Sequence, residues 1–158
     1  MNRFLAYLMR FLAIILGYAA ASLAASAFIH VFYLGSLGFG TEEGPWVVIG
    51  SLVFSIPFTA LFVAYFAFVP AIVAIFVAEM FSMRGWAFHA IAGGVVGAVV
   101  VALFRRASSA EGDVAAGDPR FALLIVGAGV VAGLVYRLVA GGRAGAWLPP
   151  RAPISPER

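Results

Sequence analysis

Three ionisable side chains lie where they could do chemistry within or at the edge of a membrane. They are Glu79, His89 and Arg137, each close to one end of a long apolar segment. His89 precedes Gly93 by four residues and Arg137 follows Gly133 by four, so each shares a helix face with its glycine. If these two helices are antiparallel neighbours, both faces meet, and Glu79 arrives at a similar depth. The sequence therefore predicts a candidate polar site made of Glu79, His89 and Arg137.

Two kinds of role fit such a site. A functional site would use His89 and Glu79 to relay protons, or Arg137 to bind an anion or a lipid headgroup. A structural lock would have Arg137 extend towards water while Glu79 neutralises its charge. Burying an ionisable group in a membrane costs free energy, so the presence of these three residues requires either a functional or a structural role. We favour the structural lock.

No other pattern in the sequence indicates a catalytic, metal or cofactor site. The absence of cysteine excludes disulfides, thiolate nucleophiles and zinc–thiolate sites. His30 has no second histidine or carboxylate at metal-binding spacing. Residues Gly127-x-Gly129-x-x-Ala132 match the dinucleotide-binding fingerprint, but the short glycine- and proline-rich remainder cannot supply the required βαβ unit. We expect no catalytic residue, no cofactor and no metal.

The composition excludes an ordinary soluble protein. Hydrophobic residues make up 64% of the 158 residues and charged residues only 11%. The net charge of +3 comes from arginines that flank apolar segments, which is typical of membrane topology and not of nucleic-acid binding. We therefore predict an all-α integral membrane bundle of about four transmembrane helices, with the lipid bilayer as its surroundings and no nucleic-acid partner.

Four apolar segments define the predicted domain, 1–142, and a proline-rich tail follows it. The expected spans are 11–37, 45–79, 86–104 and 121–140. Residues 143–158 contain four prolines and are expected to form a disordered cytoplasmic tail.

Two of the segments allow a second interpretation. The first resembles a cleavable signal peptide, but apolar residues continue past the small residues at 25–27, so a retained helix is favoured. The segment 45–79 is too long for one straight span, and Pro57 and Pro70 each remove a backbone donor. We expect one long, kinked helix, since no turn-forming residue divides it into two spans.

The arginines predict the orientation of the four-helix arrangement. Those on one side are Arg3, Arg10, Arg84, Arg137, Arg143, Arg151 and Arg158. Those on the other side are Arg105, Arg106 and Arg120. Because cytoplasmic loops carry the excess of positive charge, both termini are expected in the cytoplasm. An alanine-, glycine- and arginine-rich composition fits a bacterial inner (cell) membrane.

Small residues predict how the helices pack. Gly93 and Gly97 lie four residues apart in the third segment, and Gly129 and Gly133 do so in the fourth. Such pairs let helix backbones approach closely, either within one chain or between two copies. We favour a tight contact between the third and fourth helices, which leaves the phenylalanine-rich second helix exposed to lipid or to a partner.

Function is weighed by class, since no motif decides it. A non-enzymatic accessory, assembly or scaffold subunit of a membrane complex explains most features, with a membrane-protein partner or a homo-oligomer. The alternative is a small transporter or channel that works as a homo-oligomer through Glu79, His89 and Arg137. A membrane-embedded enzyme ranks third, because the sequence offers no evident nucleophile or metal site.

Overall fold

The computed structural model describes residues 3–36, 45–108 and 118–146, and in these ranges the chain is helical with no β-strand. The elements are α1 (Arg3–Ser36), α2 (Pro45–Met80), α3 (Trp86–Ser108), α4 (Pro119–Val139) and a short 3-10 helix, η2 (Gly141–Arg143). Each of the four α-helices is long and apolar enough to cross a membrane. The chain is an all-α, multi-pass membrane protein, as the sequence predicts.

The helix boundaries differ from the predicted spans mainly at the start of the chain. Helix α1 begins at Arg3 rather than at residue 11, so Arg10 lies about two turns inside it. The segment 45–79 forms one continuous helix, with Pro57 and Pro70 inside it, and is not divided into two spans. The bends expected at these prolines stay predictions. Residue 37 and most of the expected tail, 147–158, lie outside the described residues.

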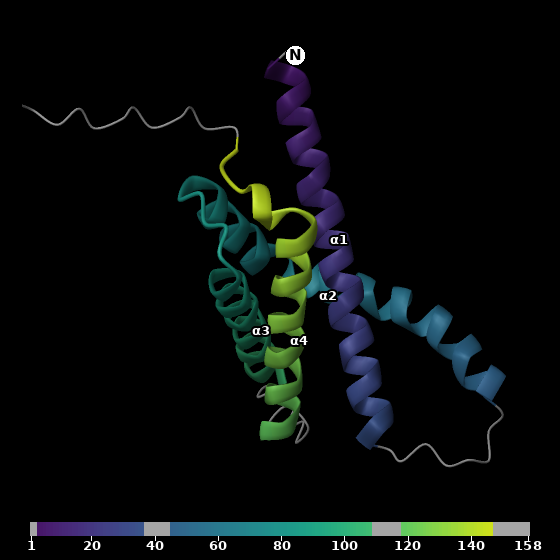
Figure 1. Ribbon diagram of the computed structural model, residues 1–158. Coiled ribbons are helices and arrows are strands. Elements are labelled where there is room, and N and C mark those ends of the chain that lie inside the picture. Colours follow the sequence, from purple (N-terminus) through teal and green to yellow (C-terminus); the bar gives the residue numbers. More distant parts are fainter. Residues whose placement is uncertain (1–2, 37–44, 109–117, 147–158) are drawn as a thin grey trace, which may run out of the picture.

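Helix α4 lies between α1 and α3 (Figure 1). Helices α1, α3 and α4 run nearly parallel or antiparallel to one another, whereas α2 crosses behind them on a slant. The first half of α2 extends away from the other helices. The N-terminal part of α1 and the C-terminal ends of α2 and α4 gather at the same end of the bundle, where α3 begins.

The α3–α4 contact is made through backbone glycines. A Cβ atom on Gly93 would overlap the carbonyl oxygen of Gly129, and one on Gly133 would overlap the carbonyl oxygen of His89. A Cβ atom on Gly97 would lie 2.7 Å from the carbonyl oxygen of Ile125. Helices in lipid associate by such close backbone approach, because the lipid tails remove any hydrophobic driving force between them. The structure thus brings all four predicted packing glycines to one seam.

Two side-chain hydrogen bonds connect α1 to α2 within the apolar region. The buried Ser26 hydroxyl donates to the carbonyl oxygen of Ile56 at 2.7 Å. The Tyr18 hydroxyl donates to the carbonyl oxygen of Ala64 at 2.5 Å. Hydrogen bonds of this kind between membrane helices contribute about 0.6 kcal/mol on average. They fix the depth at which α2 crosses α1.

The chain after α4 folds back onto the end of α2. Helix α4 begins with Asp118, whose side chain accepts a hydrogen bond from the Arg120 backbone N–H at 2.8 Å. It ends at Val139, and residues 140–146 then turn through η2. Gly145 has a φ of +69°, and a side chain there would overlap Ser82. Glycine at 145 therefore lets this segment lie against the α2–α3 connection.

Candidate functional site

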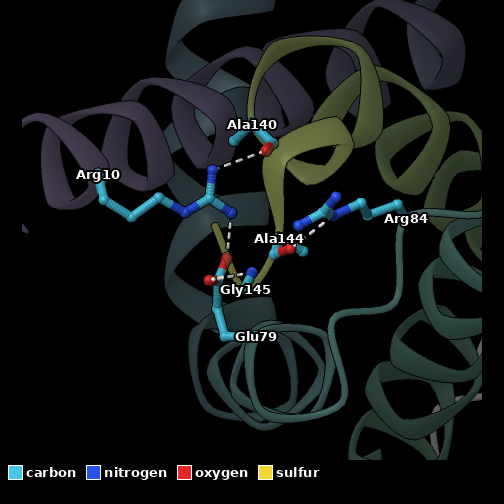
Figure 2. Close-up of polar contacts among 6 residues, drawn as sticks. All are labelled: Arg10, Glu79, Arg84, Ala140, Ala144 and Gly145. Carbon is cyan, nitrogen blue, oxygen red and sulfur yellow. Dashed lines mark hydrogen bonds and ion pairs between the residues drawn. The ribbon is translucent and has the colours of Figure 1, made fainter. Parts of the chain in front are cut away.

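A buried ion pair lies at the end of the bundle where α2 and α4 finish (Figure 2). A guanidinium nitrogen of Arg10, from α1, contacts a carboxylate oxygen of Glu79, from α2. The two side chains are only 11% and 10% exposed. The second carboxylate oxygen of Glu79 accepts a hydrogen bond from the Gly145 N–H at 3.0 Å. One carboxylate thus joins α1, α2 and the segment that follows α4.

Two arginines complete this arrangement by binding backbone carbonyls beyond the end of α4. Arg10 donates from its other terminal nitrogen to the carbonyl oxygen of Ala140 at 2.9 Å. Arg84 donates from Nε to the carbonyl oxygen of Ala144 at 2.8 Å. The last carbonyls of a helix lack partners within the helix, and a cation near them is favoured by the helix dipole. We call this group the polar junction: Arg10, Glu79, Arg84, Ala140, Ala144 and Gly145.

Arg137 lies beside the polar junction, on the α3 side of α4. Its guanidinium carbon is 4.1 Å from the centre of the Trp86 ring, and its Nε donates to the carbonyl oxygen of Arg84 at 3.3 Å. A cation over a tryptophan face is stabilised by about 0.5–1 kcal/mol at exposed sites. The contact connects the last turn of α4 to the first residue of α3.

His89 is the most deeply buried ionisable side chain among the described residues, at 4% exposed. Its Nδ1 lies 2.9 Å from the carbonyl oxygen of Gly85, and because a carbonyl can only accept, Nδ1 carries the proton. In the neutral imidazole Nε2 is then a hydrogen-bond acceptor. Nε2 has no hydrogen-bond partner among the described residues and lies against Gly141, where a Cβ atom would overlap it.

The structure brings the three predicted site residues to the same end of the bundle but gives each different contacts. Glu79 pairs with Arg10, Arg137 lies on Trp86, and His89 packs beside Tyr136 with ring centres 6.0 Å apart. Sequence reasoning missed Arg10 because the first predicted span began at residue 11. Arg10 was therefore expected outside the membrane. Apolar residues on both sides of Arg10, including Leu8 and Met9 before it, were the available signal.

A cavity of about 440 Å³ lies between the four helices. Its walls are almost entirely apolar, and its lining runs from His89 and Tyr136, next to the polar junction, to Phe104 and Phe121 at the other ends of α3 and α4. Phe62 and Phe66 from α2 also line it and are about half exposed, so the cavity opens to the surroundings beside α2. Sequence periodicity gave no indication of this space.

The remaining sequence candidates have structural roles. His30 lies 2.8 Å from the carbonyl oxygen of Ser26, one turn earlier in the same helix. The Gly127–Ala132 segment lies inside the continuous helix α4, so it is not the strand–turn–helix of a dinucleotide site. In the part of the chain that the structure describes, no group of three or more histidine or acidic residues is placed to hold a metal ion.

Comparisons with known proteins do not assign this chain to a family. No family model matches the sequence, and neither the curated proteins nor the solved structures contain a match.

Proposed function

We propose that this protein is a non-enzymatic accessory subunit of a membrane complex, and that α2 is its contact helix. The observation that carries the proposal is the isolation of α2. In its most apolar part 6% of the residues are buried inside the protein, against 28%, 17% and 11% in the most apolar parts of α1, α3 and α4. The proposed location is a bacterial inner membrane, with both termini in the cytoplasm as the arginine distribution favours.

The length of α2 makes its isolation significant. Its apolar part, Gly50–Met80, has 31 residues. At ~1.5 Å per residue this is roughly 46 Å of helix, which fits a hydrocarbon core of ~30 Å only at a tilt of roughly 50°. Membrane helices are tilted by about 0–40°, and the tilt is set by packing against neighbouring helices. The slanted first half of α2 has few such neighbours in its own chain, so another protein is the natural support (Figure 1).

The exposed surface of α2 is also suited to a protein contact. Phe54, Phe58 and Phe62 follow one another at intervals of one turn, and their rings contact each other at centre distances of 6.3 and 5.2 Å. Phenylalanine has few rotatable bonds, so a row of rings already in contact loses little freedom on binding. The partner expected here is a transmembrane helix that packs alongside Phe54–Phe62.

The polar junction favours this function over a transporter. Glu79 and Arg10 neutralise each other. The other terminal nitrogen of Arg10 donates to the Ala140 carbonyl and the other carboxylate oxygen of Glu79 accepts from the Gly145 N–H, while Arg10 Nε is buried without a hydrogen-bond partner among the described residues. A transport site must exchange such contacts for a substrate or a proton during each cycle. Here the same contacts connect the N-terminal part of α1 to the C-terminal ends of α2 and α4. This arrangement favours a structural role for the charged residues.

Site-specific photo-crosslinking in native membranes tests the proposal. Benzoyl-phenylalanine is introduced at Leu61 or Val69, which are exposed on α2, and in a matched control at Leu16, which is similarly exposed on α1. We expect the α2 positions to give one crosslinked product with a different membrane protein, and Leu16 to give none.

Two results would contradict the proposal. Crosslinks from α2 to a second copy of this chain alone would support the homo-oligomeric alternative. Equal crosslinking from Leu16, Leu61 and Val69 would show that α2 is not the contact helix.

A further inference from the structure

The end of the bundle that contains the polar junction carries an excess of positive charge. Arg10, Arg84, Arg137 and Arg143 lie at this end, and Glu79 is the only acidic residue that the described part of the chain places there. Glu79 is paired with Arg10. The charges of Arg84, Arg137 and Arg143 are thus not offset by a carboxylate of the described chain, and such an excess at a membrane surface attracts anions.

Two of these arginines are oriented by hydrogen bonds to the backbone. Arg84 donates from Nε to the carbonyl oxygen of Ala144 at 2.8 Å (Figure 2). Arg137 donates from Nε to the carbonyl oxygen of Arg84 at 3.3 Å, and its guanidinium lies over the ring of Trp86. The terminal nitrogens of both guanidinium groups form no hydrogen bond to a described residue. They present the planar fork of N–H donors that matches two oxygens of a phosphate group.

The two guanidinium groups are neighbours, and the space beside them is open. Because Arg137 bonds to the backbone of Arg84, their two positive charges lie near each other and repel. An anion that contacts both groups replaces this repulsion with attraction. A Cβ atom on Gly85, the next residue, would have no neighbouring atom within 4 Å, so a ligand can approach the chain between Arg84 and Trp86. Both arginine side chains are at least partly exposed.

The surface next to this arginine pair suits the acyl chains of a lipid. Trp86 is exposed at the start of α3, and tryptophan is enriched at the level of the lipid headgroups. From there α3 continues towards the other end of the bundle with Ile91 and Val95 exposed. A phosphate dissolved in water makes no use of such an apolar surface, whereas the chains of a phospholipid lie along it. The arrangement therefore favours a lipid as the source of the phosphate.

We propose that Arg84 and Arg137 bind the phosphate of an anionic phospholipid, whose chains lie along α3 past Ile91 and Val95. A headgroup such as that of phosphatidylglycerol fits, because its phosphate is its only charge. A zwitterionic headgroup brings a cation of its own, which the positive end of the bundle repels. The site lies on the α3–α4 side and does not include α2, so it is independent of the proposed contact with a partner protein.

Quenching of Trp86 fluorescence by brominated lipids tests the proposal. The chain has three tryptophans, and Trp46→Phe with Trp147→Phe leaves Trp86 as the only one. The full chain is placed in vesicles of phosphatidylglycerol and phosphatidylcholine in equal amounts, and one of the two lipids at a time carries brominated chains. Salt at about 0.3 M screens charges that are not in contact. We expect phosphatidylglycerol to bind beside Trp86 about tenfold more strongly than phosphatidylcholine.

Variants distinguish a site from general surface charge. Arg84→Gln and Arg137→Gln should each reduce the preference for phosphatidylglycerol about fivefold. Arg143→Gln is the matched control, because Arg143 is an exposed arginine at the same end whose side chain forms no hydrogen bond to a described residue, and it should change the preference by less than about twofold. If Arg84→Gln fails to fold by circular dichroism, Arg84→Lys takes its place. Lysine keeps the charge but lacks the fork, so a loss of about threefold is expected.

Three results would overturn the proposal. Equal quenching by the two brominated lipids would show that no anionic lipid is selected beside Trp86. A loss for Arg143→Gln equal to that for Arg84→Gln and Arg137→Gln would show attraction by the total charge and not by an oriented pair. Displacement of brominated phosphatidylglycerol by millimolar glycerol phosphate would show that the pair binds soluble phosphate groups and does not select a lipid.

Discussion

Replacing Glu79 with glutamine should destabilise the bundle strongly, because it breaks the buried ion pair with Arg10. The amide keeps the shape of the carboxylate and an oxygen that can accept from the Gly145 N–H, so the substitution removes little besides the charge. Arg10 is then left 11% exposed without its counter-charge. Breaking a buried ion pair by removing one partner costs about 3–5 kcal/mol. Because Arg10 keeps its bond to Ala140, we expect the lower end, about 3 kcal/mol.

A double-mutant cycle separates the pair from general damage to the fold. Arg10→Gln should cost about as much as Glu79→Gln, and the double variant should lose roughly 2 kcal/mol less than the sum of the two. Arg106→Gln is the matched control, since Arg106 is exposed at the other end of α3, and it should change stability by less than about 0.5 kcal/mol.

The assay is unfolding in detergent micelles, followed by circular dichroism as the denaturing detergent fraction rises. A change within about 0.5 kcal/mol for Glu79→Gln would refute the reasoning, because removing one partner of a buried ion pair costs about 3–5 kcal/mol. Strict additivity in the cycle would refute it equally, since groups in contact couple. Either result would leave the polar junction without an energetic role.

Three further predictions concern the packing of the helices, and each is measured by the same unfolding assay. Gly93→Ala should cost about 1–3 kcal/mol because its methyl group overlaps a backbone carbonyl across the α3–α4 seam, whereas Gly50→Ala, with open space around it, should be neutral or stabilising. Tyr18→Phe and Ser26→Ala should each cost about 0.6 kcal/mol, and no more than about 1.7, through loss of an α1–α2 hydrogen bond. Arg137→Gln should cost only about 0.5–1 kcal/mol because it removes a stacking contact at the edge of the bundle and not a buried charge pair. A loss for Arg137→Gln equal to that for Glu79→Gln would contradict this distinction.

The helices could be predicted because lipid imposes one strong rule on sequence. Every backbone group must be bonded inside the membrane, so long apolar segments become helices, and their ends follow the charges and turn residues. The α2 segment is the clearest example, since Phe62 to Phe68 contains no glycine, charged residue or asparagine that could form a turn, and the structure has one helix there. Spacings of four residues likewise identified the glycines that meet at the α3–α4 seam.

The partners of the charged residues could not be predicted, because they depend on how distant helices are arranged. The sequence places Glu79 and Arg137 near one membrane boundary, but only the position of α1 brings Arg10 to Glu79. The contacts of Arg10 with Ala140 and of Glu79 with Gly145 involve backbone atoms, which any residue type carries. The cavity is equally invisible in the sequence, because alanines at helical spacing normally indicate a packed helix contact.

The mass of the complex extracted from native membranes in mild detergent, with its components identified, tests the accessory-subunit function most directly. We predict a stoichiometric companion membrane protein, and we predict that bulky polar substitutions at Phe54 and Phe58 release it while the chain remains folded and abundant. A complex that contains this chain alone, as a monomer or a homo-oligomer, would contradict the proposed function.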